Sequence, residues 1–340
     1  MMEKIQLSRK AKKVKSPKKR SKKKIIGYSL LGVLAALLVV GTILYLMLKP
    51  ENHFTNVPVF NPGQGTESEN DEQKTVQLKD PIFNILLIGS DQRKGQSIGH
   101  SDTMIVINVN LKDYEYNMLS IPRDSRVYLD GYGYTKLTSV QYILQAEHGS
   151  EKGIQEAVKA ISSFTGIPIN YYAETSFEGL AGIIDTLGGI DMNVPFDVNI
   201  SHAGKGQVIT AGTHSLDGKT VVDLVRERKS LAAGEFGRQQ LQKEALVGIA
   251  KKALNVGTIT KLPELVKKLD EFIIETNLSH TDILSMAYAV QNFKPNEQIK
   301  YHQLTGKSQS LYDDILQANN SQFVVDEEEM KKIVEEYFIN

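Results

Sequence analysis

Residues 84–123 read NILLIGSDQRKGQSIGHSDTMIVINVNLKDYEYNMLSIPR and contain the apolar runs that decide the fold. Asn84–Ile88 is short, apolar and closed by a glycine, which is typical of a buried strand. Met104–Leu111 alternates and is rich in β-branched residues, which indicates a second strand. Tyr116–Ile121 predicts a third, after a connection of hairpin length. The stretch therefore predicts neighbouring antiparallel strands.

Antiparallel order brings three charged side chains to one edge of this sheet. Asp91 follows the first strand, Asp102 precedes the second, and Arg123 follows the third. Two carboxylates at one edge suit a Mg²⁺ ion that keeps several waters and bridges phosphate oxygens. Plainer interpretations stay open, because Asp commonly caps turns and Arg123 with Asp124 could form a surface ion pair of little energetic value.

Helical and strand patterns alternate over the rest of the chain. Asp326 and Glu329 resemble a capping box that opens a final helix, and Ser279 is a candidate cap for the helix before it. Strands mixed with helices on a central sheet make this an α/β (α+β) fold, a mixed sheet flanked by helices. The expected helices are Ser139–Glu147, Lys152–Thr165, Phe177–Leu187, Gly218–Arg226, Arg238–Leu254, Pro263–Ile274 and Thr281–Val290, and the further strands are Ile190–Val194 and Gln207–Ile209.

A second unusual stretch, Leu224–Gln242, reads LVRERKSLAAGEFGRQQLQ. Arg226 and Arg228 share a face only in extended chain, so we expect a helix to end near Arg226. Arg238 and Gln242 are four residues apart at the start of the next helix and share one side of it. A helix N-terminus favours an anion, and Arg binds phosphate oxygens in a bidentate fork. The stretch indicates a phosphate or pyrophosphate ligand, with a solvated basic patch as the alternative.

The N-terminal fifty residues predict a membrane anchor. Residues 1–24 hold 12 of the 40 basic residues and one of the 40 acidic ones. Ile25–Leu48 is an uncharged, mostly apolar run whose helix, at about 1.5 Å per residue, is long enough to cross a bilayer core. It lacks the small-residue site of a cleaved signal peptide. We expect a single-pass protein whose N-terminus is cytoplasmic and whose C-terminal domain is extracellular.

Composition excludes several function classes. The chain has no cysteine, which removes disulfides, thiolate catalysis and Cys-based zinc sites. Beyond residue 24, 28 basic residues face 39 acidic ones, which is the wrong sign for a nucleic-acid-binding domain. The histidines show no HExxH pattern, and no nucleophile elbow or phosphate-binding loop motif is present. Residues 49–79 are rich in Pro, Gly, Asn, Gln and charge, so we expect an extracellular linker with little to bury.

Six motifs in order resemble those of the LytR-CpsA-Psr family. They are NILLIGSDQR, SDTMIVINVN, MLSIPRDSRVYLDGYGYTKL, GIIDTLGGIDMNV, LDGKTVVDLVRERK and GEFGRQQLQ, which lie between about residues 82 and 256. The resemblance implies a catalytic domain over residues 80–256 and a C-terminal helical or α+β extension over 257–340 packed on it. It also implies that the lipid chain of a substrate lies in an apolar cleft.

The implied activity is that of a cell-envelope phosphotransferase. Such enzymes take an anionic glycopolymer, such as wall teichoic acid or capsule, from a polyprenyl-pyrophosphate carrier and join it to peptidoglycan. By position, Asp91 and Asp102 match the ligands of Mg²⁺ (or Mn²⁺). The resemblance implies catalytic roles for Asp91, Asp102, Arg123, Arg226 and Arg238, and pyrophosphate binding by Arg93, Arg123, Arg226, Arg228, Arg238 and Gln242. The alternatives are a hydrolase of the same lipid pyrophosphate and a non-enzymatic membrane-bound regulator of envelope genes.

Three positions depart from the pattern of that family. His100 stands where an Arg commonly precedes Ser-Asp-Thr, Leu241 replaces a second Arg, and Glu235 replaces an Asp. Leu241 lies on an apolar stripe with Ala245, so we expect a structural role for it. His100 matters more, because an Arg is always charged whereas a His is mostly neutral at pH 7. Weaker phosphate binding is one expected consequence, and Arg93 is a candidate to compensate together with Lys94.

Overall fold

The computed structural model describes residues 38–39, 41–42, 45–63, 74–201, 206–255, 262–290 and 294–339. Two units are distinguished, Met1–Met47 and Leu48–Asn340, and the second contains all the elements discussed below. Over the described residues, no helix is both long and apolar enough to cross a bilayer. The basic tail and most of the expected anchor lie outside the described residues, so that prediction is not tested.

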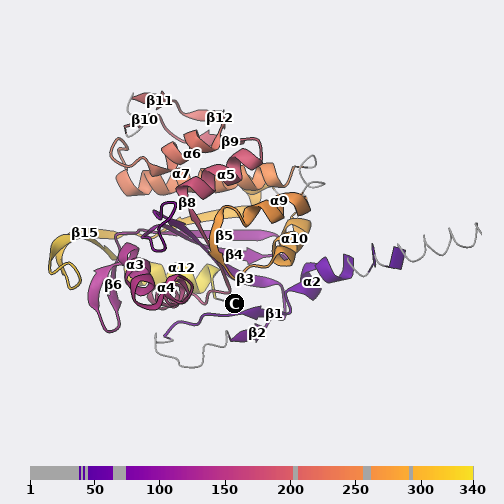
Figure 1. Ribbon diagram of the computed structural model, residues 1–340, viewed down its shortest axis with the longest axis horizontal. Helices are drawn as coiled ribbons and strands as arrows, with labels where there is room; N and C mark the ends of the chain where they lie inside the picture. The colour runs from indigo at the N-terminus through magenta and orange to yellow at the C-terminus, as the bar shows by residue number, and fades with distance from the viewer. Residues whose placement is uncertain are drawn as a thin grey trace, which may run out of the picture. The chain divides into compact units, whose positions relative to one another are not determined.

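A six-stranded sheet forms the centre of Leu48–Asn340 (Figure 1). Its order is β13-β8-β3-β4-β5-β14. The predicted antiparallel trio is confirmed, because β3 pairs antiparallel with β4 and β4 with β5. The sheet is mixed, since β8 runs parallel to β3 and β14 runs parallel to β5. The strands are β3 Ile82–Ser90, β4 Ser101–Asn110, β5 Glu115–Ile121, β8 Tyr171–Ser176, β13 Ile273–Thr276 and β14 Ile299–Gln303.

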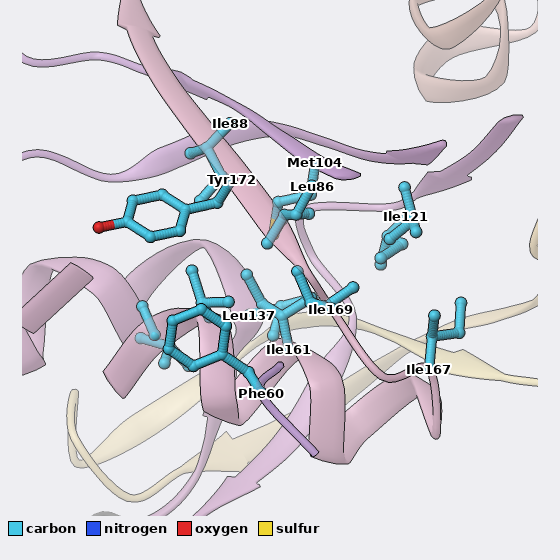
Figure 2. Close-up of a cluster of buried hydrophobic side chains, with 14 of the residues drawn as sticks. Phe60, Leu86, Ile88, Met104, Ile121, Leu137, Ile161, Ile167, Ile169 and Tyr172 are labelled. Carbon is cyan, nitrogen blue, oxygen red and sulfur yellow. The ribbon is translucent and has the colours of Figure 1, made fainter. Parts of the chain in front are cut away.

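Side chains alternate between the two faces of the sheet, and each face is covered by helices. Leu86 and Ile88 of β3 face a buried cluster that also contains residues of α3, α4 and α12, such as Leu137 and Ile161 (Figure 2). Leu87, between them in sequence, faces α5 and α7 on the other side. The helices are α3 Leu137–His148, α4 Ser150–Thr165, α5 Phe177–Thr186, α6 Gly218–Arg226, α7 Gly234–Ala253, α9 Leu262–Leu269, α10 His280–Ala289 and α12 Glu327–Tyr337, with the single turns α2 Pro50–His53 and α11 Pro295–Gln298.

Antiparallel strand pairs surround the central sheet. One of them, β15–β16, lies beside β6–β7 and is joined to it by backbone hydrogen bonds at Asp314 and Asp124 (Figure 1). Another, β9–β12, carries α6 and α7 on its inner face through a second apolar cluster. The pairs are β1 Asn56–Pro58 with β2 Thr75–Gln77, β6 Arg126–Leu129 with β7 Gly133–Lys136, β9 Ile190–Val194 with β12 Gly212–Leu216, β10 Val198–Ile200 with β11 Gln207–Ile209, and β15 Gly306–Asp313 with β16 Ala318–Val325.

The prediction of a linker with little to bury is wrong for its N-terminal part, residues 54–60. Phe54, Val57 and Phe60 are buried, and the ring of Phe54 lies 4.6 Å from that of Phe83. The sequence prediction missed these apolar residues because they lie among Pro, Asn and Thr in a segment of mostly polar composition. Residues 64–73 of the expected linker lie outside the described residues.

Two helices also differ from the sequence prediction by more than two residues at one end, and one predicted capping box is incomplete. The helix expected over Pro263–Ile274 ends at Leu269, because the β-branched run that follows pairs with β8 as strand β13. Helix α7 begins at Gly234 rather than Arg238, so Arg238 is not at its N-terminus. Asp326 does cap α12, but its expected box partner Glu329 accepts a hydrogen bond from Thr305 instead. The Ser279 cap is confirmed and is half of a complete capping box.

The segment after residue 256 is part of the sheet itself. It supplies both edge strands, β13 and β14, as well as α12, which packs against the main apolar cluster through Val334 and Phe338. A buried amide on β3, Asn84, also donates to the carbonyl oxygen of Phe338 over 3.0 Å. The expected extension therefore completes the core.

Candidate active site

A polar cavity of about 960 Å³ opens at the edge of the sheet where β3 ends and β4 begins. The loop between these strands forms one wall, and Tyr142 of α3 and Phe177 of α5 contribute to the others. Of the residues predicted from sequence, four line this cavity: Asp91, Arg93, Asp102 and Arg226. The expectation that the two aspartates meet at one sheet edge is confirmed, because antiparallel pairing places their strand ends side by side.

The two aspartates have different environments. The Asp91 side chain is 43% exposed, accepts a 2.7 Å hydrogen bond from the His100 amide, and lies 3.4 Å from the Nδ1 of His100. The Asp102 side chain is 18% exposed and accepts a 2.5 Å hydrogen bond from the Nη1 of Arg123. Burial acts to lower the pKa of Arg123, but the Asp102 carboxylate outweighs it and raises that pKa. The Arg123 guanidinium thus stays charged at any physiological pH.

The chemistry of this pair fits a hard cation that retains water. Both groups are carboxylates, and each has oxygen lone pairs beyond those used by His100 and Arg123. Within the described ranges, no cluster of three or more His, Cys, Asp or Glu side chains could hold a metal ion. A site of two carboxylates leaves coordination positions for water and phosphate oxygens, as Mg²⁺ sites commonly do.

Arg238 lies behind the cavity wall, and the structure gives it partners within the protein. It is 4% exposed, and both Nη atoms donate over 3.0 Å to the backbone carbonyl of Asp102. Its Nε and Nη2 also donate to the Glu235 carboxylate, over 3.0 and 2.6 Å. Two arginines thus hold Asp102: Arg123 binds its side chain, and Arg238 binds its backbone carbonyl. Four of the five N–H donors of Arg238 are thus engaged within the protein.

Gln242 follows Arg238 by one helical turn and holds the next residue of β4. Its Nε2 donates to the Thr103 hydroxyl over 2.8 Å, and the residue is 8% exposed. The departure at Leu241 is structural, as expected, because that side chain is fully buried in the cluster of α6, α7 and β9. The sequence prediction that these residues share one side of a helix is therefore confirmed, but that side faces β4.

Arg226 and Arg228 flank a buried carboxylate. Helix α6 ends at Arg226 as predicted, because Glu227 is extended and its carboxylate accepts hydrogen bonds from Ser201 and from the amide of Ser230. Burial acts to raise the pKa of Glu227, but these hydrogen bonds lower it to about 2. With Glu227 turned inward, the two arginines point outward on the same face.

The partners of the two arginines differ. The Arg226 guanidinium lies 4.4 Å from the centroid of the Phe177 ring and faces the polar cavity. The Nη2 of Arg228 lies 3.2 Å from the Asp124 carboxylate, and its Nε lies 3.6 Å from that of Glu235. Burial acts to raise the pKa of Asp124, but Lys136, Arg123 and Arg228 together lower it. Glu235, one of the departures, thus joins Arg228 to Arg238.

An apolar cavity of about 200 Å³ adjoins the polar one. Its walls are the face of the sheet that carries Leu87 and Ile105, together with α5 and α7. Phe177 lines both cavities, so the two spaces are neighbours. The Phe177 ring therefore separates the two cavities: the Arg226 guanidinium lies over it, and the apolar cavity borders it. Sequence reasoning missed Phe177, whose only signal was its place directly after a helix cap.

A buried polar network lies beneath the aspartates and was also missed. The carboxyl of Glu174 on β8 is fully buried and accepts a 2.6 Å hydrogen bond from Gln141 of α3. Gln141 in turn accepts a 2.5 Å hydrogen bond from Ser101, the residue before Asp102. Burial raises the pKa of Glu174, although hydrogen bonds from Gln141 and Ser90 oppose it. This network ties the end of β3, at Ser90, and the start of β4, at Ser101, to the core.

Fold and site together define a mixed α/β protein with a polar cavity at one edge of its sheet and an apolar cavity next to it. Comparison with known proteins gives the family: the model of the LytR_cpsA_psr family matches residues 56–338, and the chain belongs to that family. The match begins and ends outside the range of the six sequence motifs, in keeping with the contribution of β1, β13, β14 and α12 to the fold.

Relatives of known name agree with this assignment. The chain is 29% identical over 291 residues to the polyisoprenyl-teichoic acid–peptidoglycan teichoic acid transferase TagU of Bacillus subtilis. The aligned region covers 85% of this chain and 89% of that protein. The crystal structure of B. subtilis TagV superposes with a TM-score of 0.63 at 29% identity, over 77% of this chain and 98% of that one. A structure of TagT (YwtF) with bound octaprenyl pyrophosphate lipid gives a TM-score of 0.58 at 26% identity, over 82% and 97%.

Proposed function

We propose that this chain is a phosphotransferase that moves an anionic glycopolymer from a polyprenyl-pyrophosphate carrier to peptidoglycan. The observation that carries the proposal is the shared wall of the polar and apolar cavities at Phe177. A polyprenyl pyrophosphate has a charged head and a hydrocarbon chain, which match the two cavities in polarity and in order. The printed names of TagU and of the lipid-bound TagT support the same substrate and reaction class.

The reaction forms one phosphorus–oxygen bond and breaks another. A hydroxyl oxygen of the acceptor bonds to the phosphorus that carries the glycopolymer, the bridging oxygen leaves with the polyprenyl phosphate, and the hydroxyl proton passes to solvent. Arg226 and Arg93 line the cavity and offer guanidinium donors to phosphate oxygens. Positioning and charge stabilisation dominate phosphoryl transfer, so a rigid wall matters as much as its charge.

Asp91 and Asp102 are the residues that would hold a Mg²⁺ ion. When bound, the ion would offset the charge that develops on the departing polyprenyl phosphate. Arg123 and Arg238 fix Asp102 through its carboxylate and its carbonyl, and His100 fixes Asp91. These positioning contacts support a metal site, since a carboxylate held by its neighbours loses little freedom when it binds an ion.

The same proposal includes the location of the protein. The basic tail and the apolar run Ile25–Leu48 support a single-pass membrane protein with residues 50–340 outside the cell. Protease added to intact cells after removal of the wall should digest residues 50–340. Protection of that region would contradict the location and favour a regulator that acts from inside.

Activity is tested with the full chain in detergent. A lipid-pyrophosphate glycan is incubated with soluble peptidoglycan oligomers, and the products are analysed by mass spectrometry. A product with glycan and peptidoglycan joined through one phosphate is expected. Free glycan phosphate as the sole product would identify a hydrolase, and unchanged lipid would contradict enzymatic function.

A further inference from the structure

A third cavity, of about 480 Å³, continues from the polar one on the side away from the apolar cavity. His100 and Tyr142 line both this cavity and the polar one, whereas Phe177 lines the polar and apolar ones. The three spaces thus follow one another as apolar cavity, polar cavity and this groove. We call it the tyrosine groove and define it by Tyr132, Ser139, Tyr142, Ile143, Ile315 and Leu316.

The outer wall of the groove is the turn between β15 and β16, which is held firmly in place. Asp313 is 1% exposed, and its carboxylate accepts hydrogen bonds of 3.0 Å from the amides of Ile315 and Leu316. The same carboxylate accepts from the Thr135 hydroxyl over 3.1 Å. The Asp314 amide donates to the Tyr134 carbonyl over 2.8 Å, and the Asp314 carboxylate accepts from the Tyr134 amide over 2.5 Å, so the turn is joined to β7. This anchored turn presents Leu316 at 64% exposure and Ile315 at 36%.

Leu316 and Ile315 line the groove together with Tyr142 and Ile143, and such a contiguous apolar surface in a groove indicates a ligand surface. The inner wall is aromatic, because the Tyr142 ring, itself 41% exposed, stacks on His100 with centroids 4.6 Å apart and planes 7° from parallel. Flat rings and a few polar groups, here Ser139 and Glu147, are typical of pockets that bind a ligand with both apolar and polar faces. A sugar ring has such faces.

Charge decides which saccharide fits. Among the described residues that line the groove there is no Lys or Arg, and there is one carboxylate, Glu147. An anionic glycopolymer would meet no counter-charge there and would be repelled by Glu147. A glycan strand without a high density of phosphate would meet neither obstacle.

The order of the cavities agrees with the geometry of the reaction. In phosphoryl transfer the attacking and leaving oxygens lie roughly in line, on opposite sides of the phosphorus. The leaving group carries the polyprenyl chain, which the proposed function places in the apolar cavity beyond Phe177. The attacking hydroxyl must then approach from the opposite side of the polar cavity, where His100 and Tyr142 open into the tyrosine groove.

We propose, on the basis of the proposed function, that the tyrosine groove is the acceptor subsite and binds the saccharide strand of peptidoglycan. Tyr142 stacks on a sugar ring next to the reacting hydroxyl, and Leu316 with Ile315 packs against the ring beyond it. The groove thereby sets which hydroxyl of the strand reaches the phosphorus.

The test compares groove variants with matched exposed variants elsewhere. Tyr142→Ala and Leu316→Ala remove groove side chains, and each should raise the KM for peptidoglycan oligomers about tenfold. Because Leu316 does not line the polar cavity, the KM for the lipid donor should stay within about twofold in Leu316→Ala. The controls are Tyr288→Ala, a helical tyrosine of similar exposure at 39%, and Val208→Ala, an exposed strand residue at 56%. Both controls should match the wild type.

Binding of the same oligomers to the full chain in detergent is measured in parallel by saturation-transfer NMR. Tyr142 and Leu316 variants should lose the saccharide signal, and the controls should keep it. An unchanged acceptor KM, an unchanged saccharide signal, or a rise in the donor KM instead would overturn the acceptor subsite. A wild-type protein that binds the oligomers through the groove but forms no linked product would contradict the proposed function and leave the binding assignment supported.

Discussion

Replacing Arg238 with methionine tests whether this residue holds Asp102 in place or binds the ligand. Methionine keeps much of the length and apolar volume of the arginine but none of its hydrogen bonds. The change leaves the Glu235 carboxylate, 12% exposed, without its 2.6 Å partner and the Asp102 carbonyl without two donors. Breaking a buried ion pair by removing one partner costs about 3–5 kcal/mol. That is the expected loss in the free energy of unfolding.

Lysine at the same position should be intermediate. It keeps the charge but not the planar fork, so it can serve Glu235 or the Asp102 carbonyl but not both in the observed geometry. We expect a loss of about 1.5–3 kcal/mol, the value of a hydrogen bond to a charged group. In Arg238→Met/Glu235→Gln the uncompensated charge is gone, so the double variant should recover at least about 1 kcal/mol relative to Arg238→Met.

The assay is urea unfolding of each variant followed by the transfer rate under folded conditions. Transfer should fall about a hundredfold in Arg238→Met, because a shift of about 1 Å in a catalytic group has an effect of that size. Lys251→Ala, an exposed change on the same helix, is the control and should be silent. Wild-type unfolding in Arg238→Met, combined with lost transfer and lost lipid affinity, would refute the positioning role and show that Arg238 contacts the pyrophosphate.

Three further predictions concern the carboxylates, the apolar cavity and acid stability. Asp91→Asn and Asp102→Asn should each abolish transfer at saturating Mg²⁺ with folding retained, while the exposed control Asp113→Asn keeps wild-type activity; transfer by either site variant would exclude a metal role. Ala173→Phe, which fills the apolar cavity, should raise the KM for a long-chain donor by about tenfold and leave a short-chain donor unaffected; equal effects on both would place the lipid elsewhere. The pKa of Glu227 is lowered from its ordinary value of about 4.5 to about 2, so the ionised carboxylate stabilises the fold fully above pH 4.5. This stabilisation should be lost as pH falls from 4.5 towards 2 in the wild type, whereas Glu227→Gln should already be less stable at pH 7 and should not show this loss. Parallel curves of stability against pH for the two proteins would contradict this.

The central strands and the acidic edge could be predicted from the sequence because their signals are local. Alternating β-branched runs and a short connection determine β4 and β5, and antiparallel order then places Asp91 and Asp102 together whatever the rest of the chain does. The end of α6 at Arg226 followed from the spacing of two arginines, since i and i+2 share a face only in extended chain.

Other features depended on contacts between distant segments. Ile273–Thr276 continues a helical pattern in sequence, but the open edge of β8 takes it as a strand. The sequence predicts a ligand-binding role for Arg238, but nothing in it reveals that the Asp102 carbonyl, 136 positions earlier, also lies within reach of its guanidinium. The same reason explains why the sequence did not indicate Phe177, Tyr142 or the β15–β16 turn. An exposed aromatic or apolar residue can be assigned a binding role only when the cavity that it lines is known.

The role of His100 also became clear only in the structure. Its amide and ring both face Asp91, and the ring stacks on Tyr142. A histidine here therefore positions a carboxylate and an aromatic wall, whereas the charge that an arginine would bring to the cavity is available from Arg93 and Arg226, which line it.

The account is tested most directly by carrying out the reaction in H₂¹⁸O with the full chain, a lipid-pyrophosphate glycan and peptidoglycan oligomers. Mass spectrometry of the phosphate that leaves with the glycan reports which oxygen attacked. We predict a glycan–phosphate–peptidoglycan product without ¹⁸O, formed in equal amount with polyprenyl monophosphate. Glycan phosphate that carries one ¹⁸O and no peptidoglycan would show that water is the acceptor and would contradict the transferase.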